Sequence, residues 1–332
     1  MNMYYQAKRS RMPFVVLLLT IFTTLFLSAM YAAPGFAEEP ESGDSDEMVA
    51  TMVGNYFELP GEISFKFIVS VPKGMGDGVT GEIICMDKSV KVAPDVYDDE
   101  GSETVLEFSY GVMLPSIREE ISLTLYDAGG QRIPFYHGST EFKDDTVVCT
   151  VYDVLKNCEK SDESILELAS TMRNFCERAR RNFGVHSEIP CDEDVVVIFK
   201  SLLEPYAVKK EELPDGIEYA GTAISFDNMS LRVYFYVDED VDLGLFDVRV
   251  DGEPVELEQY KDNIYMTKIP SFPAELYGEG HTVTVNGAEI SNISLLTQVY
   301  NIVNDDDYDQ KGREMYMSLY YFSQAAKAYY ND

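Results

Sequence analysis

The sequence of 332 residues is poor in several side chains that carry much of protein chemistry. It has no tryptophan, three histidines and five cysteines. The histidines, His137, His186 and His281, lie far apart, and no Cys-x-x-Cys pair occurs. This inventory leaves little basis for a zinc site, for histidine-dependent catalysis or for a cysteine protease.

Positive charge is also scarce. The chain has 26 lysines and arginines against 58 acidic residues, a formal charge of −32, and no basic cluster interrupts it. Such a chain repels phosphate backbones, which argues against nucleic acid as a partner. It is nevertheless 45% hydrophobic and 12% aromatic, enough apolar surface to offset the entropy of folding.

The N-terminus has the features of a secretory signal. Lys8, Arg9 and Arg11 precede an apolar run, and small residues lead up to Ala37, so we expect residues 1–37 to be cleaved as a signal peptide. The alternative is an uncleaved segment that anchors the protein, which would be its only link to a membrane. After cleavage 23 basic and 58 acidic residues remain, a formal charge of −35 (23 − 58) that suits a secreted, extracellular or cell-surface protein.

The spacing of apolar residues along the sequence divides the remaining chain into parts. Residues 38–54 are acidic and aperiodic, which predicts a disordered tether. Apolar residues then alternate, as in strands, and change to helical spacing at 147–184, which defines a first module over 55–184. Residues 185–214 are a predicted linker with a short helix near 195–203. The same order recurs in a second module over 215–332, with its helix pair at 292–331.

These patterns predict an α+β fold of two tandem modules. Each module is a small antiparallel, Ig-like β-sandwich followed by a packed α-helical hairpin. A shift of 147 residues aligns the two helix ends, placing Phe175 over Phe322 and Ala179 over Ala326. The chain is therefore predicted to contain an internal repeat.

Three stretches resemble repeated modules of secreted and surface proteins of gut Clostridia, whose function is undescribed. They are Leu203 to Val208, Leu213 to Gly221, and Ser230-Leu231-Arg232-Val233-Tyr234-Phe235. The ending Tyr321 to Tyr330 follows the family's Tyr-Asn-Gln-Ala-Ala-x-Ala-Tyr-Phe pattern, whereas Asn174 to Phe183 departs from it, with Cys176 in a glycine position and charged residues in place of two alanines. The resemblance implies an extracellular accessory or surface protein and supplies no active site.

No catalytic residues are predicted. Carboxylates are plentiful, but they occur in acidic runs that are typical of solvated loops, and no nucleophile, zinc or phosphate-loop motif is present. Asp305, Asp307 and Asp309 alternate like the first half of a calcium loop, yet Gln310 and Tyr316 occupy the places where the loop needs Gly and Glu. We therefore expect these acids to favour the N-terminus of the next helix, and no cofactor is predicted, with calcium as the alternative.

Three residues are candidates for binding. We expect Tyr321 and Tyr329 to be exposed on the last helix, while Tyr316, Tyr320 and Tyr330 pack inward. Arg232 is out of phase with the apolar residues of its strand, so it is expected to face solvent or a carboxylate, with a ligand role as the alternative. The absence of tryptophan argues against a glycan platform.

The five cysteines are too sparse for a disulfide scaffold. If Cys149 opens one helix and Cys176 lies late in the next, antiparallel packing would bring them together as a disulfide. The alternative is that both are small buried hydrophobic residues.

Taken together, the sequence predicts a non-catalytic secreted or cell-surface protein that acts as a binding, adhesion or spacer module. Its partner would be an unidentified extracellular protein or glycan. The alternative is a polysaccharide-active enzyme or its accessory carbohydrate-binding module, which would require two carboxylates facing each other across a cleft.

Overall fold

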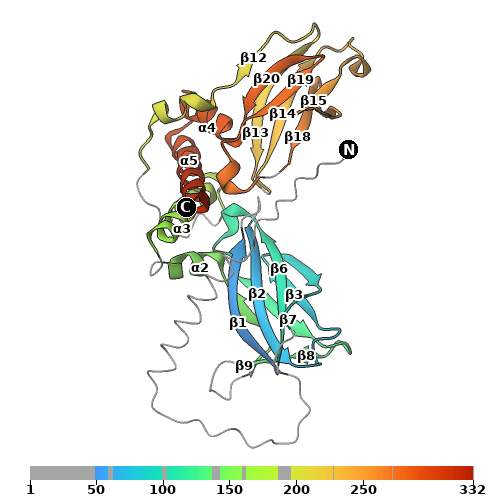
Figure 1. Ribbon diagram of the computed structural model, residues 1–332, viewed down its shortest axis with the longest axis vertical. Helices are drawn as coiled ribbons and strands as arrows, with labels where there is room; N and C mark the ends of the chain where they lie inside the picture. The colour runs from blue at the N-terminus through green and yellow to red at the C-terminus, as the bar shows by residue number, and fades with distance from the viewer. Residues whose placement is uncertain are drawn as a thin grey trace, which may run out of the picture.

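The computed structural model has an α+β fold, as predicted, with antiparallel sheets and helices in one chain (Figure 1). It describes residues 49–58, 63–98, 103–136, 143–158, 162–185, 196–226, 228–270 and 272–331. The predicted signal peptide and most of the tether lie outside these ranges, as does Cys191. We call residues 49–184 the first half and residues 196–331 the second half.

Two sheets make up most of the first half. One has the strand order β10-β9-β1-β2-β6-β5 and the other the order β11-β7-β3-β4, with β8 paired to β7. The strands are β1 (Ala50–Glu58), β2 (Ile63–Pro72), β3 (Thr80–Cys85), β4 (Lys88–Val92), β5 (Asp95–Asp98), β6 (Glu103–Val112), β7 (Ile121–Tyr126), β8 (Arg132–Ile133), β9 (Phe135–Tyr136), β10 (Lys143–Asp144) and β11 (Val147–Cys149).

The second half has two further sheets. Their strand orders are β13-β14-β18-β17 and β12-β20-β19-β15-β16. The strands are β12 (Lys209–Lys210), β13 (Ile217–Ser225), β14 (Ser230–Val237), β15 (Val248–Val250), β16 (Glu253–Pro254), β17 (Glu258–Lys261), β18 (Ile264–Ile269), β19 (His281–Val285) and β20 (Ala288–Ile293).

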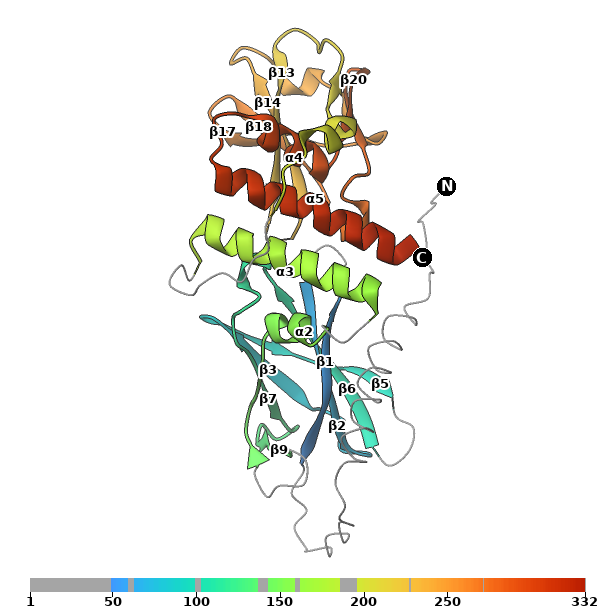
Figure 2. The same ribbon diagram turned by 90° about the vertical axis from the view of Figure 1, so that its left-hand side faces the viewer.

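Helices follow the strands in each half. In the first half they are α2 (Val151–Asn157) and α3 (Glu163–Phe183), and in the second half α4 (Leu295–Asn304) and α5 (Gln310–Asn331). Figure 2 shows α3 and α5 side by side in a layer that separates the two pairs of sheets. Short 3-10 helices lie at η1 (Leu114–Ser116), η3 (Lys200–Leu202), η4 (Glu204–Tyr206), η5 (Leu243–Leu245) and η6 (Ala274–Leu276).

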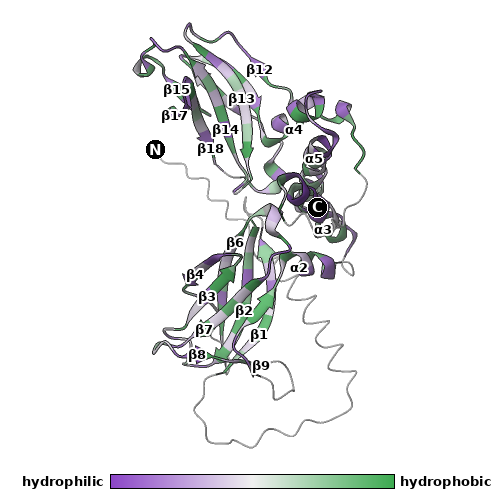
Figure 3. Cartoon of the chain, turned by 180° about the vertical axis from the view of Figure 1, so that it is seen from behind, coloured by the Kyte–Doolittle hydropathy of each residue, from purple (hydrophilic) through white to green (hydrophobic). Residues whose placement is uncertain are grey.

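The buried apolar residues form two separate cores. One is confined to the sheets of the second half and contains Leu231, Val233 and Phe235 of β14. The other is larger and runs from the sheets of the first half through the helices of both halves. Figure 3 shows the apolar colour along the central strand β2 and the hydrophilic colour on the edge strand β4. The helical layer is therefore packed as part of the first half's core, although α4 and α5 belong to the second half.

Local turn and capping chemistry places several boundaries where the sequence predicts them. Asp251-Gly252 and Asn286-Gly287 have positive φ at both positions, as type I′ hairpin turns require. Gly184 ends α3 in the left-handed conformation, and the Val185 N–H donates to the Arg180 carbonyl at 3.0 Å. Ser294 begins α4 with a capping box, because its hydroxyl accepts from the Thr297 N–H at 3.1 Å.

Four of the predicted boundaries are wrong. Residues 292–293, predicted as helix, belong to β20, and α4 begins only after Ser294 caps it. Residues 50–54, predicted as tether, belong to β1, because Ala50 is fully buried and this stretch pairs with β2 and β9. Residues 147–149, predicted as helix, form β11 paired with β7, and the helix begins only after Thr150 caps it. The short helix expected near 195–203 is instead two 3-10 turns, η3 and η4, with Pro205 in the second.

The two glycines Gly81 and Gly54 give a test of how closely the first pair of sheets is packed. A Cβ on Gly81 would lie 2.8 Å from Phe108 Cδ1 of the opposing sheet, whereas a Cβ on Gly54 meets nothing within 4 Å. We expect Gly81→Ala to lower the free energy of unfolding by about 1–3 kcal/mol, the usual cost of overpacking a core. Gly54→Ala should leave it unchanged or slightly raised. Urea unfolding followed by circular dichroism measures both, and equal effects would contradict the close packing.

Two partly buried tyrosines contribute to a dependence of stability on pH at the alkaline end. Burial raises the pKa of Tyr219 in β13 and of Tyr316 in α5 from 10.0 to about 12, because the tyrosinate form is poorly solvated there. The unfolded chain therefore loses these protons first, so stability is full below pH 10 and falls as the pH rises toward 12. Urea midpoints between pH 8 and pH 11.5 should show this fall, with a shallower slope for Tyr219→Phe. An unchanged slope in that variant would contradict the assignment.

Candidate functional site

The outer face of the sheet β13-β14-β18-β17 carries a group of exposed aromatic side chains. Leu231, Val233 and Phe235 of β14 point into the core, so the alternate residues of the strand lie on the opposite face. Pairing with β18 and β17 adds neighbours to that face. We call this set the tyrosine face, and its members are Arg232, Tyr234, Tyr236, Tyr260, Ile264, Met266 and Lys268.

The tyrosine face combines aromatic and cationic groups. Tyr236 and Tyr260 are 46% and 55% exposed, values far above those of core aromatics. Tyr260 meets Tyr234 edge to face, with ring centroids 5.3 Å apart. Lys268 Nζ lies 3.0 Å from Glu258 Oε2, and Arg232 donates to Ser225 Oγ at 3.0 Å. Tyrosine and arginine in this arrangement are the residues that dominate many binding interfaces.

The sheet β10-β9-β1-β2-β6-β5 of the first half has a different surface. There Lys66 Nζ lies 2.8 Å from Glu107 Oε1, and the Tyr56 hydroxyl donates to Glu107 Oε2 at 2.6 Å. Lys66 also donates to Ser109 Oγ at 2.7 Å. These polar groups satisfy one another within the face, whereas Tyr236 and Tyr260 present apolar ring surface to solvent.

A second feature is a buried ionic cluster in the first half, where α2, α3 and the loop after η1 meet. Glu177 of α3 is fully buried and forms ion pairs with Arg118 and with Arg180, whose Nη2 lies 2.8 Å from Glu177 Oε2. Arg118 follows η1 and also lies over the ring of Tyr152 in α2, 3.7 Å from its centroid. The cluster thus ties the loop after η1 to both helices of the first half.

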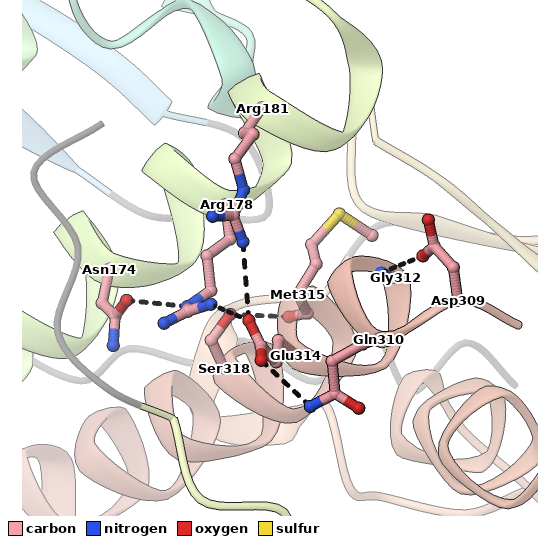
Figure 4. Close-up of polar contacts among 9 residues, drawn as sticks. All are labelled: Asn174, Arg178, Arg181, Asp309, Gln310, Gly312, Glu314, Met315 and Ser318. Carbon is pink, nitrogen blue, oxygen red and sulfur yellow. Dashed lines mark hydrogen bonds and ion pairs between the residues drawn. The ribbon is translucent and has the colours of Figure 1, made fainter. Parts of the chain in front are cut away.

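A related ion pair joins the two halves, and Figure 4 draws its partners. Arg178 Nη1 of α3 lies 2.6 Å from Glu314 Oε2 of α5, and Arg181 Nη2 lies 3.5 Å from the same oxygen. Asn174 accepts from Arg178 Nε at 3.0 Å, and Gln310 donates to Glu314 Oε1 at 3.0 Å. Arg178 is almost completely buried, so this pair fixes the relative position of two helices.

Acidic side chains in the turn before α5 accept hydrogen bonds from backbone N–H groups. Asp309 Oδ1 accepts from the Gly312 N–H at 2.7 Å, which caps the helix, and Asp305 Oδ1 accepts from the Asp307 N–H at 2.9 Å. Asp309 therefore lies at the N-terminus of α5, as predicted for these acids, whereas Asp305 follows the end of α4 and bonds within the turn. Within the described ranges no group of three or more His, Cys, Asp or Glu side chains is arranged to hold a metal ion.

The remaining predicted binding residues are distributed differently from expectation. Arg232 belongs to the tyrosine face. Tyr321 is only partly exposed, and its hydroxyl donates to the Val197 carbonyl at 2.8 Å. Tyr329 is half-buried against the large core, whereas Tyr330, expected to pack inward, is 45% exposed. The prediction for Tyr329 and Tyr330 is therefore reversed, because a shift of one residue turns a helical side chain by about 100°.

The predicted Cys149–Cys176 disulfide is absent, and both residues are free thiols. Cys149 ends β11 and accepts from Asn55 Nδ2 at 2.9 Å, while Cys176 is fully buried on α3 beside Tyr277 of the second half. The two therefore face different parts of the molecule. Burial raises the pKa of both thiols, which disfavours the reactive thiolate form.

A pocket of about 310 Å³ lies in the second half, between η5 and the segment before β17. Its lining includes the apolar side chains of Leu243, Phe246, Val248 and Val255, and Glu256 is the ionisable group among the described residues there. Glycoside hydrolysis by the usual mechanism needs a pair of carboxylates, so this pocket does not supply that chemistry.

The comparisons with known proteins add no family. A scan of the chain against models of protein families finds no match, and a search of curated proteins finds none either. Among the described helices, none is both long enough and apolar enough to cross a membrane.

Replacement of Glu177 tests the buried ionic cluster. Glu177→Gln keeps the shape of the side chain but removes the charge that balances Arg118 and Arg180. We expect the free energy of unfolding to fall by about 3–5 kcal/mol, as when one partner of a buried pair is lost. Glu258→Gln, which breaks the exposed pair with Lys268, is the matched control and should cost at most about 1 kcal/mol. Urea unfolding compares the two, and a similar small loss in both would contradict the role assigned to Glu177.

Proposed function

We propose that this chain is a non-catalytic secreted or cell-surface protein that binds an extracellular protein or glycan through its second half. The signal-like N-terminus and the excess of acidic residues support the location. The observation that carries the binding role is the tyrosine face, where Tyr236 and Tyr260 are exposed beside Arg232 and Lys268.

The proposal includes a repeated architecture of two Ig-like modules. The sheet order β1-β2-β6-β5 corresponds strand by strand to β13-β14-β18-β17, and the order β11-β7-β3-β4 to β20-β19-β15-β16. A 3-10 helix follows β6 and β18 alike, and a short and a long α-helix close each half. A bulge also falls at matching places, next to Gly54 in β1 and Gly221 in β13. Duplication of one module accounts for this agreement.

In this arrangement the two modules have different roles. The first module has a polar face in which Lys66 and Glu107 satisfy each other, and its core supports the helical layer. The second module presents aromatic rings that contribute large contact areas at a low cost in side-chain entropy. The first module thus acts as the support and the second as the binding module.

Screening residues 38–332 against arrays of glycans and extracellular proteins tests the proposal. We expect a saturable interaction that Tyr236→Ser with Tyr260→Ser weakens at least about tenfold, the loss expected for interface hot spots. Tyr308→Ser is the matched control, because Tyr308 is 42% exposed but lies in the turn between α4 and α5. Adding calcium or a chelator should leave the interaction unchanged, since Asp305 and Asp309 hold backbone N–H groups.

Two outcomes would contradict the proposed site. Binding that Tyr308→Ser weakens as much as the double variant would place the contact elsewhere. The absence of any interaction across both arrays would leave a spacer role and remove the binding role.

A further inference from the structure

The contact between α3 and α5 is built around equivalent residues of the two halves. Phe175 and Phe322, which align in the predicted repeat, stack on each other with ring centroids 6.1 Å apart and planes 13° from parallel. Contact between a residue and its own equivalent is what a two-fold axis produces in a symmetric dimer. The two helices also run antiparallel in Figure 2, as such an axis requires.

The buried positions of the two helices agree over their length. Six positions separated by 147 residues are buried in both helices; the side chains differ in size at one of them, Arg178 and Ala325, and are similar in size at the other five. Those five pairs are Leu168 and Met315, Met172 and Leu319, Phe175 and Phe322, Cys176 and Ser323, and Ala179 and Ala326. The face that α3 presents is therefore nearly interchangeable with the face that α5 presents.

The charges differ between the two helices in one informative way. Arg178 of α3 pairs with Glu314 of α5, and the residue of α3 equivalent to Glu314 is Glu167, which is exposed. The residue of α5 equivalent to Arg178 is Ala325. The intramolecular contact therefore contains one such ion pair, whereas a contact between two α3 helices would contain two, each between Arg178 and Glu167 of the other copy.

We infer that the α5-binding face of α3 is self-complementary and fits the α3 helix of a second copy of this chain. The inference rests on the repeat proposed above and is independent of the tyrosine face. In the intact chain α5 occupies this face, because it is tethered nearby at a high effective concentration. A chain whose α5 is displaced should therefore dimerise through its first half, with Phe175 stacked on Phe175.

The test uses the full chain with α5 weakened by Glu314→Arg and Phe322→Arg together, which place cations opposite Arg178 and Arg181 and remove the ring stack. Light scattering after size-exclusion chromatography should give the monomer mass for the native sequence and twice that mass for this variant. Circular dichroism shows whether the variant is folded. Glu314→Arg alone, a milder change, serves as the second variant if the double substitution unfolds the chain.

A charge-reversal series then identifies the contact. Adding Glu167→Arg to the displaced variant should weaken the dimer at least about tenfold, because two ion pairs become repulsive. Glu167→Arg in the otherwise native chain is the control and should remain a monomer. A folded displaced variant that stays monomeric, or a dimer indifferent to Glu167→Arg, would overturn the inference. Loss of array binding would instead bear on the tyrosine face.

Discussion

The rest of the structure depends on the burial of one helical face, the side of α3 that carries Phe175. Neither half alone covers the apolar face of its long helix, because α3 and α5 each bury a row of apolar residues that the sheets of the same half do not cover. Packing these stripes against each other sets the positions of α2, α4 and the 3-10 helices η1 and η6, which all contact the long helices. Phe226, from the turn after β13, extends the contact by packing on Phe175 and Phe183.

The ion pairs in this layer select an arrangement more than they stabilise it. Burying Glu177 and Arg180 costs desolvation energy that their attraction offsets only when the geometry is good. A pair of apolar helix faces could slide or rotate against each other, whereas Arg178 meets Glu314 at one register only. Arg178 is therefore the charged residue that joins the two long helices, whereas Glu177 joins α3 to Arg118 within the first half.

The sequence is informative where structure is local. Alternation along β14, the Asp-Gly and Asn-Gly turns and the end of α3 at Gly184 all follow from side chains within a few residues of one another, and all were predictable. The segment 147–149 was not, because two adjacent valines fit either period and pairing with β7 decided the matter. The sequence allows only part of the tyrosine face to be predicted. Tyr234 and Tyr236 alternate with core residues, but only the pairing of β17 with β18 brings Tyr260 beside them. Arg118 and Glu177 lie 59 residues apart, and no local pattern relates them.

The core shared by the two halves also constrains the order in which the chain can fold during synthesis. The face of α3 is synthesised well before α5, its partner, since the sheets of the second half lie between them in the sequence. A ribosome therefore delivers the first pair of sheets with an uncovered apolar helix attached, and that helix stays uncovered until α5 is synthesised. During this interval Phe175 and its neighbours are exposed to chaperones and to other nascent copies. The sheets of the second half have a core of their own and can mature without waiting. Packing of α5 against α3 therefore has to follow the synthesis of the strands of both halves.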